Sequence, residues 1–260
     1  MISVTSAQLD AWLAAFIFPL ARVLGLFSAG PVFSSLAIPQ NIRLVAGVAV
    51  TLAIAPAIPP MPAIAAGSWV GLAVLAQQVV IGILLGFSLR IAFVAVDVAG
   101  DLIGLQMGLS FAVFYDPAKA AQTAVITEFF SLLAVLLFLS LDGHLLMLSL
   151  LAQIFTLLPV SLAPFAAKGY SVLLAWSATI FLAGVLLSLP LITALLIANI
   201  AMGVLTRVAP QLNLFAIGFP VTIMAGFLVI MISLPYFAAA LEHLFSQGFA
   251  AMVAIMKAGA

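Results

Sequence analysis

Between Arg43 and Arg90 the chain reads LVAGVAVTLAIAPAIPPMPAIAAGSWVGLAVLAQQVVIGILLGFSL, a run of 46 residues without one charged side chain. Two other runs share this character: 38 uncharged residues separate Lys168 from Arg207, and 34 separate Arg207 from Glu242. About 20 apolar residues cross a bilayer as a helix, so each run has room for one or two spans. The sequence therefore predicts a polytopic membrane protein.

The composition of the whole chain leads to the same class. Of its 260 residues, 67% are hydrophobic and 5% are charged, whereas a soluble domain carries about 25% charged residues. Lipid or other apolar subunits must therefore cover its helices. The formal net charge is zero, so the chain has no basic field that would attract nucleic acid. The absence of cysteine excludes a disulfide framework, thiolate catalysis and cysteine-based metal sites.

Charged and proline-rich positions divide the chain into segments. We expect the N-terminus to be retained in the membrane, because the first nine residues lack the Lys or Arg of a signal peptide. Four prolines between positions 56 and 62 predict an uncharged turn, and Asp142-Gly143-His144 predicts a tight polar hairpin corner. Apolar helices are expected at residues 11–27, 44–57, 69–96, 124–141, 145–158, 172–201 and 214–241. The stretch 242–257 is expected to form a short amphipathic helix in the membrane interface.

These segments do not suit a bundle of straight spans. Segments 44–57 and 145–158 have 14 residues each, about 21 Å of helix against a hydrocarbon core of about 30 Å. Pro190, Pro220 and Pro235 are expected to interrupt other segments, because each removes a helix hydrogen bond. Irregular backbone persists at membrane depth only where protein or a cavity covers it. We therefore predict an all-α fold of short, kinked antiparallel helical hairpins, packed irregularly against neighbouring subunits.

One predicted helix carries charged and small residues on a single face. At 100° per residue a narrow arc contains Arg90, Asp97, Asp101, Gly104 and Gly108. Charges at membrane depth usually face a partner or water, so this seam is a candidate lining of a conduit or a gating contact. The alternative is an Arg90–Asp97 pair combined with close helix packing at the GxxxG steps that begin at Gly100. A further hypothesis is that Asp97 and Asp101 respond to protons, because burial raises the pKa of carboxylates.

A loop with bulky side chains is expected after this helix. Asp116 precedes Pro117 and is therefore pushed toward an extended conformation. Phe111, Phe114 and Tyr115 then lie on a loop, where large apolar side chains need a surface to pack on. Packing on the same subunit is the simpler interpretation, and a movable constriction of a channel is the sharper one.

Few residues suggest chemistry. His144 and His243 lie far apart in the sequence without a cluster of metal ligands, and no GxSxG, HExxH or phosphate-binding motif occurs. An intramembrane hydrolase would need a serine paired with His144, and nothing singles one out. A small secondary transporter would need broken helices in repeated halves; Pro190 and Pro220 supply breaks, but no repeat is evident. We expect neither enzymatic activity nor a metal or cofactor.

Several motifs resemble the FliR/SpaR family of type III secretion export-apparatus proteins. The most specific are GLQMGLSF at 104–111 and APQL at 209–212, with PLARVL at 19–24, DGHL at 142–145, LPLIT at 189–193 and IGFP at 217–220 in support. The similarity extends from about residue 10 to about residue 245. It favours the flagellar branch, with the equivalent subunit of a virulence injectisome as the alternative.

This resemblance implies a non-enzymatic subunit of the flagellar export gate in the bacterial inner membrane, at the flagellar basal body. Its partners would be homologous FliP-type subunits, FliQ-type subunits, an FlhB-type protein, membrane lipid and the unfolded polypeptides that pass through the channel. The whole chain, 1–260, would be one membrane domain. It would comprise a helical part to about residue 108, a plug-like loop at about 106–120 and a second helical part at about 121–260.

The resemblance also implies which residues form the plug. They are Gln106, Met107, Gly108, Ser110, Phe111, Phe114, Tyr115 and Asp116. Apolar and thioether side chains suit such a role, because they pack adaptably against irregular partners and exclude ions from a constriction.

Overall fold

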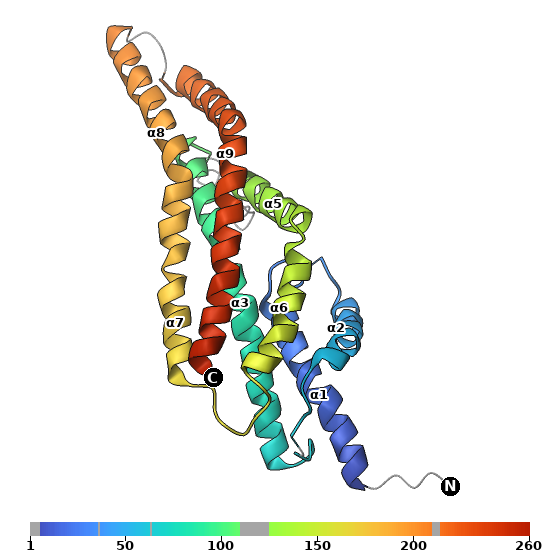
Figure 1. Ribbon diagram of the computed structural model, residues 1–260. Helices are drawn as coiled ribbons and strands as arrows, with labels where there is room; N and C mark the ends of the chain where they lie inside the picture. The colour runs from blue at the N-terminus through green and yellow to red at the C-terminus, as the bar shows by residue number, and fades with distance from the viewer. Residues whose placement is uncertain (1–5, 36, 63, 110–124, 210–213) are drawn as a thin grey trace. The chain divides into compact units, whose positions relative to one another are not determined.

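The computed structural model describes residues 6–35, 37–62, 64–109, 125–209 and 214–260. All regular elements in these ranges are helical (Figure 1). They are α1 (Ser6–Ala29), α2 (Gln40–Ile54), the 3₁₀ turn η1 (Ala55–Ala57), α3 (Trp69–Gln106), α5 (Val125–Ser140), α6 (Gly143–Leu157), α7 (Ala167–Ser177), α8 (Thr179–Val208) and α9 (Leu214–Gly259). The predicted all-α class is confirmed.

Five helical stretches of the described chain are long and apolar enough to cross a membrane. They are Gln8–Ala29, Gln40–Ala57, Trp69–Gln106, Ala167–Val208 and Gly218–Gly259. A sixth candidate arises if α5 and α6 are taken together as one broken span. These helices agree with the predicted polytopic membrane protein. The corner predicted at Asp142 lies where α5 ends and α6 begins, and Asp142 adopts a left-handed conformation there, with φ of 54°.

The prediction that internal prolines break the later helices is wrong. Pro190 lies inside α8, and Pro220 and Pro235 lie inside α9, which continues for 46 residues. A proline removes one backbone donor, but the hydrogen bonds of the neighbouring turns remain, and apolar spans tolerate this loss through local adjustment. Pro19 is accommodated inside α1 in the same way.

Several predicted boundaries also need correction. The helix expected at 69–96 continues to Gln106, and the one expected at 172–201 is divided into α7 and α8, which together extend from Ala167 to Val208. The second helix begins at Gln40, directly after Pro39, rather than at residue 44. Arg43 lies in its first turn, and its side chain donates a hydrogen bond to the Ser35 carbonyl at 3.2 Å. Together with η1 this stretch reaches 18 residues and is no longer short for a span. The stretch 242–257 is the continuation of α9 rather than a separate interfacial helix. Met252 and Met256 are completely buried there, so this end of α9 belongs to a packed core.

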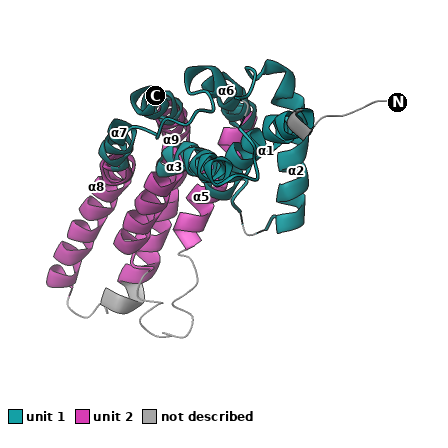
Figure 2. Cartoon of the chain, turned by 90° about the horizontal axis from the view of Figure 1, so that it is seen from below, with its two compact units in different colours: residues 1–91, 141–177, 246–260 teal, residues 92–140, 178–245 magenta. Residues whose placement is uncertain are grey.

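The chain forms two compact units (Figure 2). Unit 1 comprises residues Met1–Ile91, Leu141–Ser177 and Ser246–Ala260, and unit 2 comprises Ala92–Ser140 and Ala178–Phe245. Helices α3 and α9 contribute residues to both units. That the whole chain forms one membrane domain stays a prediction.

In unit 1, helices α1 and α3 lie parallel and in backbone contact. A Cβ atom placed on Gly86 would lie 2.6 Å from the backbone nitrogen of Gly30, and one placed on Gly82 would lie 2.9 Å from the Cα of Gly25. Only residues without a side chain allow two helices to approach so closely. The GILLG step at 82–86 is therefore a helix-packing motif.

A buried cation lies between the same two helices. The side chain of Arg22 is 0% exposed. Its Nε donates to Oε1 of Gln78 at 2.8 Å, its second terminal nitrogen donates to the same oxygen, and its first donates to the carbonyl of Leu158 at 3.0 Å. The guanidinium carbon lies 4.1 Å from the ring centre of Phe155.

All of these partners of Arg22 are uncharged. Leu158 follows the last residue of α6, so its carbonyl lies at the negative end of that helix, where carbonyls lack helical partners. The amide oxygen of Gln78 and the aromatic face of Phe155 add further negative potential. Arg22 therefore joins α1, α3 and the end of α6 through one buried charge.

We predict that Gln78→Leu lowers the thermal unfolding midpoint of the detergent-solubilised chain. The substitution removes the main acceptor of a buried charge, a change that costs roughly 3–5 kcal/mol. Replacing both partners, as in Arg22→Met with Gln78→Leu, removes the charge itself and is expected to restore most of the loss. Gln77→Leu is the matched control, because Gln77 is half-buried and donates to the Ala163 carbonyl rather than to a charged group. A double variant no more stable than Gln78→Leu would contradict this assignment.

Candidate functional site

The predicted carboxylates face hydroxyl groups across an antiparallel helix pair in unit 2. The hydroxyl of Thr127 in α5 donates to Asp101 of α3 at 2.5 Å, and the hydroxyl of Ser131 donates to Asp97. The pairing runs in opposite directions along the two helices, as in an antiparallel hairpin. We call these four residues the carboxylate–hydroxyl ladder.

The GxxxG steps of α3 contribute unequally to this helix pair. A Cβ atom placed on Gly100 would lie 2.6 Å from the Cα of Thr127, so the backbones of α3 and α5 touch at this point. A Cβ atom on Gly104 would lie 3.8 Å from the Cβ of Ile126, which is ordinary contact. Gly108 lies beyond the helix end with φ of +82°, a conformation that favours glycine. Close approach is therefore required at Gly100 and not at Gly104.

We predict that Gly100→Ala destabilises the chain and that Gly104→Ala does not. The first substitution forces the backbone of α5 away from α3, whereas the second adds a methyl group in permitted contact and removes the helix penalty of glycine, about 1 kcal/mol. Thermal unfolding in detergent measures the difference. Equal losses for the two variants would show that the close approach at Gly100 does not stabilise the pair.

Arg90 does not join the ladder in the way that the predicted seam suggested. It belongs to unit 1, where its guanidinium donates to the hydroxyl of Ser34 at 3.1 Å. Asp97, Asp101 and Gly104 belong to unit 2. The hydrogen bonds thus direct the cation to the residues after α1 and the carboxylates to α5. The role of the seam as a conduit lining stays a prediction.

Three of the predicted plug residues lie within the described chain. Gln106 is the last residue of α3, and Met107 is completely buried. A Cβ atom on Gly226 of α9 would lie 2.5 Å from the terminal carbon of Met107, so the thioether lies against that glycine. Gly108 faces the ring of Phe219, also in α9. The other predicted plug residues lie outside the described chain: Ser110, Phe111, Phe114, Tyr115 and Asp116.

Aromatic contacts hold α5 against α9 in the same unit. The ring centres of Phe130 and Phe237 are 4.4 Å apart. Further along, Phe138 meets Phe245 edge to face at 5.4 Å, and Phe93 of α3 stacks on Phe245 at 5.0 Å. The second half of α3, α5 and the middle of α9 therefore share one aromatic core, which holds both helices of the ladder against α9.

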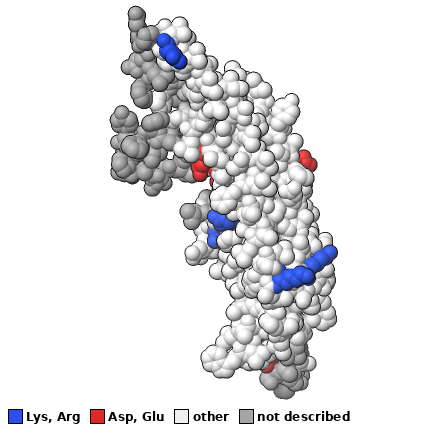
Figure 3. All heavy atoms as spheres, turned by 90° about the vertical axis from the view of Figure 1, so that its left-hand side faces the viewer, with Lys and Arg blue, Asp and Glu red and all other residues white. Residues whose placement is uncertain are grey.

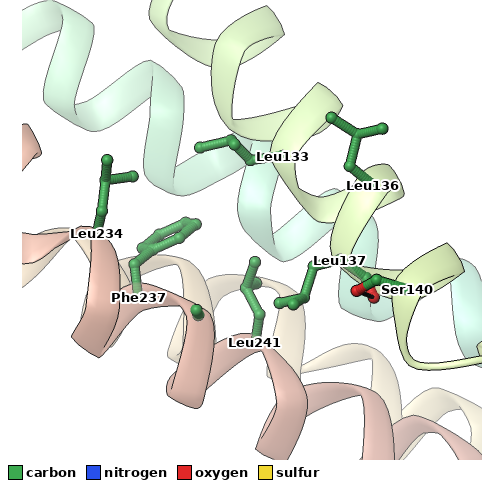
Figure 4. Close-up of a pocket in the computed structure, with 8 residues that line it drawn as sticks. Leu133, Leu136, Leu137, Ser140, Leu234, Phe237 and Leu241 are labelled. Carbon is green, nitrogen blue, oxygen red and sulfur yellow. Dashed lines mark hydrogen bonds between the residues drawn. The ribbon is translucent and has the colours of Figure 1, made fainter.

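An apolar groove of about 420 Å³ runs between α5 and α9. Figure 4 shows Leu133 and Leu137 directed toward Phe237 and Leu241 across it. The remaining lining residues are Leu136, Ser140, Leu234 and Ala238. Ser140 donates its hydroxyl to the Leu137 carbonyl of its own helix. The groove thus offers an almost entirely apolar surface.

Polar side chains that could carry chemistry are few and scattered among the described residues. Within the ranges that the structure covers, no group of three or more His, Cys, Asp or Glu side chains is placed to hold a metal ion. Nδ1 of His144 is buried and has no hydrogen-bond partner among these residues. Figure 3 shows a face of mostly uncharged atoms with only isolated charged groups.

Sequence reasoning did not single out Arg22 or Gln78. A signal was present, because Arg22 interrupts the apolar stretch of the first span and Gln77-Gln78 interrupts that of the third. Ionisable residues inside predicted spans are candidates for internal pairing. The sequence could not supply the partner, since Leu158 contributes a backbone carbonyl that any residue carries.

Comparisons with known proteins agree with the resemblance found in the sequence. The family described as "Bacterial export proteins, family 1" matches residues 13–248. A flagellar biosynthetic protein FliR of Pectobacterium carotovorum is 43% identical over 253 residues, covering 96% of this chain and 95% of that protein. The FliR of Escherichia coli K12 is 43% identical over 249 residues, with the same coverage of both chains. One from Buchnera aphidicola is 33% identical over 235 residues, covering 90% and 91%.

These matches span nearly the whole chain. The chain therefore belongs to this family of bacterial export proteins, and within it to the FliR group of flagellar biosynthetic proteins. It is an integral membrane component of the flagellar export apparatus, and the predicted flagellar branch is confirmed.

Proposed function

We propose that the chain is a non-enzymatic subunit of the flagellar protein export gate in the bacterial inner membrane. In this role it forms part of the channel wall for unfolded flagellar polypeptides and contributes a plug at about residues 106–120. The observation that carries the proposal is its near full-length similarity to FliR proteins. The exposed apolar surface of several spans supports an assembled subunit.

The spans differ greatly in how much the chain itself buries them. In the most apolar window of α3, 67% of the residues are buried, against 11% for Gln40–Ala57, 22% for Ala167–Val208 and 17% for Gly218–Gly259. Large side chains such as Val45, Phe181 and Met231 are mostly exposed. Such surfaces need lipid or apolar partner proteins to cover them. FliP-type and FliQ-type subunits and an FlhB-type protein are the proposed partners.

We predict that the chain is more stable in a complex than alone. When it is expressed alone and extracted in mild detergent, we expect a lower yield and a lower unfolding midpoint than when FliP-type and FliQ-type proteins are co-expressed with it. Size-exclusion chromatography with light scattering measures the outcome. A small secondary transporter, the rival proposal, would instead form a stable monomer or homo-oligomer without these partners.

The proposed plug begins where α3 ends. Met107 and Gly108 continue the chain from Gln106 and lie against α9 at Gly226 and Phe219. A methionine packed on glycine can change rotamer at small cost because the thioether is flexible. Such contacts suit a seal that opens for a polypeptide and closes again. The remaining residues of the proposed plug, 110–120, are assigned from the sequence.

Deleting Ser110–Phe114 tests the seal. We expect increased leakage of ions across the inner membrane of cells that express the assembled gate, because the deletion removes two of the phenylalanine side chains that would block the channel. Leakage is measured with a membrane-potential dye. Co-purification with the partner subunits, at the level of the unmodified chain, is the control for assembly. Unchanged leakage from an assembled gate would refute the sealing role.

A further inference from the structure

We infer that the carboxylate–hydroxyl ladder positions the two helix ends that flank the proposed plug. The ladder consists of Asp97 and Asp101 in α3 and of Thr127 and Ser131 in α5. It acts through hydrogen bonding, with the carboxylates as acceptors and the hydroxyls as donors. The effect of the ladder on channel closure rests on the proposed function. The ladder itself lies within the described residues.

The ladder lies close to the end of α3 and to the start of α5. Asp101 lies five positions before Gln106, the last residue of α3, and Thr127 is the third residue of α5. The helix ends on both sides of residues 107–124 are thus joined within their final or first two turns. A connection at this place sets the distance between the two ends of the intervening segment.

The hydroxyls of the ladder bond differently from the other hydroxyls of these helices. Serine and threonine hydroxyls in the described apolar helices commonly donate to carbonyls of their own helix, as Ser140 of α5 does to Leu137 and Ser88 of α3 does to Leu85. Thr127 and Ser131 instead donate to carboxylates of another helix. A hydrogen bond to a charged acceptor is stronger than one to a carbonyl, so the two hydroxyls connect the helices rather than cap their own backbone.

Close packing makes the ladder a short and directional link. The backbone contact at Gly100 lies between the two pairs in sequence and brings α5 within reach of both short carboxylate side chains. Met107 and Phe130 then hold the same ends of α3 and α5 against α9, at Gly226 and Phe237. Apolar packing alone permits helices to slide or rotate, whereas two hydrogen bonds one turn apart define a single register.

The test removes the donors while preserving side-chain size. Thr127→Val with Ser131→Ala is compared with Ser140→Ala, the matched control, whose hydroxyl makes an intrahelical bond in the same helix. Backbone hydrogen–deuterium exchange is measured on the assembled complex in detergent. We expect exchange at residues 125–131 to become about tenfold faster in the double variant, as the loss of two interhelical bonds implies. Exchange at residues 76–90 and in the control variant should stay unchanged.

The second arm distinguishes hydrogen bonding from proton sensing. Asp97→Asn with Asp101→Asn keeps two acceptor oxygens for the hydroxyls but removes the titratable groups. We expect this variant to retain most of the protection from exchange and a sealed membrane, whereas Asp97→Ala with Asp101→Ala should match the donor-deficient variant. Equal defects of the asparagine and alanine variants would overturn the ladder as a hydrogen-bonding device. Unchanged exchange in the donor-deficient variant would overturn it as well.

Membrane leakage links the ladder to the gate and separates the two proposals. The donor-deficient variant should leak ions while it still assembles with its partners. If the Ser110–Phe114 deletion leaks and the donor-deficient variant does not, the ladder has no influence on the seal. The proposed plug would then still be supported. A deletion that does not leak would refute the plug, while altered exchange in the ladder variants would still support the link between the helix ends.

Discussion

The absence of water around most of this chain is the constraint from which its structure follows. Without solvent, each backbone donor and acceptor needs a partner within the protein, and helices satisfy this need within a single segment. The same constraint governs polar side chains. Serine hydroxyls donate hydrogen bonds to carbonyls three residues earlier in their own helices, as Ser28 does to Gly25 and Ser88 does to Leu85. The groups that cannot be satisfied locally connect different helices.

Arg22 and the two aspartates represent two solutions to this problem. The cation receives a glutamine oxygen, a helix-terminal carbonyl and an aromatic face, all of them neutral. The anions receive hydroxyl donors from a neighbouring helix. In both cases the charged side chain specifies which helices meet and in which register, because few other arrangements satisfy it. Apolar packing then supplies most of the contact area.

The helices could be predicted from the sequence because a long apolar run between charged residues indicates a membrane-spanning helix. Their ends were less predictable. Pro220 and Pro235 were expected to break the last helix, but a long apolar helix retains enough hydrogen bonds around each proline to continue. The start at Gln40 is hidden in the sequence because Arg43 interrupts the apolar run, although its side chain reaches the Ser35 carbonyl from the first turn of the helix.

The sequence identified the charged and small residues of the candidate site, but only some of their contacts. The helical period placed Arg90, Asp97 and Asp101 on one face, but it could not show that Arg90 turns to Ser34 while the aspartates turn to α5. Glycine spacing predicted close packing without showing that Gly100 needs it and Gly104 does not. Partners that lie far away in the sequence, or that are backbone atoms, leave no periodic signal.

The partners of Arg22 also impose an order on biosynthesis. Gln78 follows it by 56 positions and Leu158 by 136. A ribosome adds about 5–20 residues per second, so the carbonyl of Leu158 emerges roughly 7–27 seconds after the arginine. During that interval the first helix carries a cation without its final ligands. The nascent chain must therefore wait at the insertion machinery, or keep this helix near the aqueous boundary, until the later segments arrive.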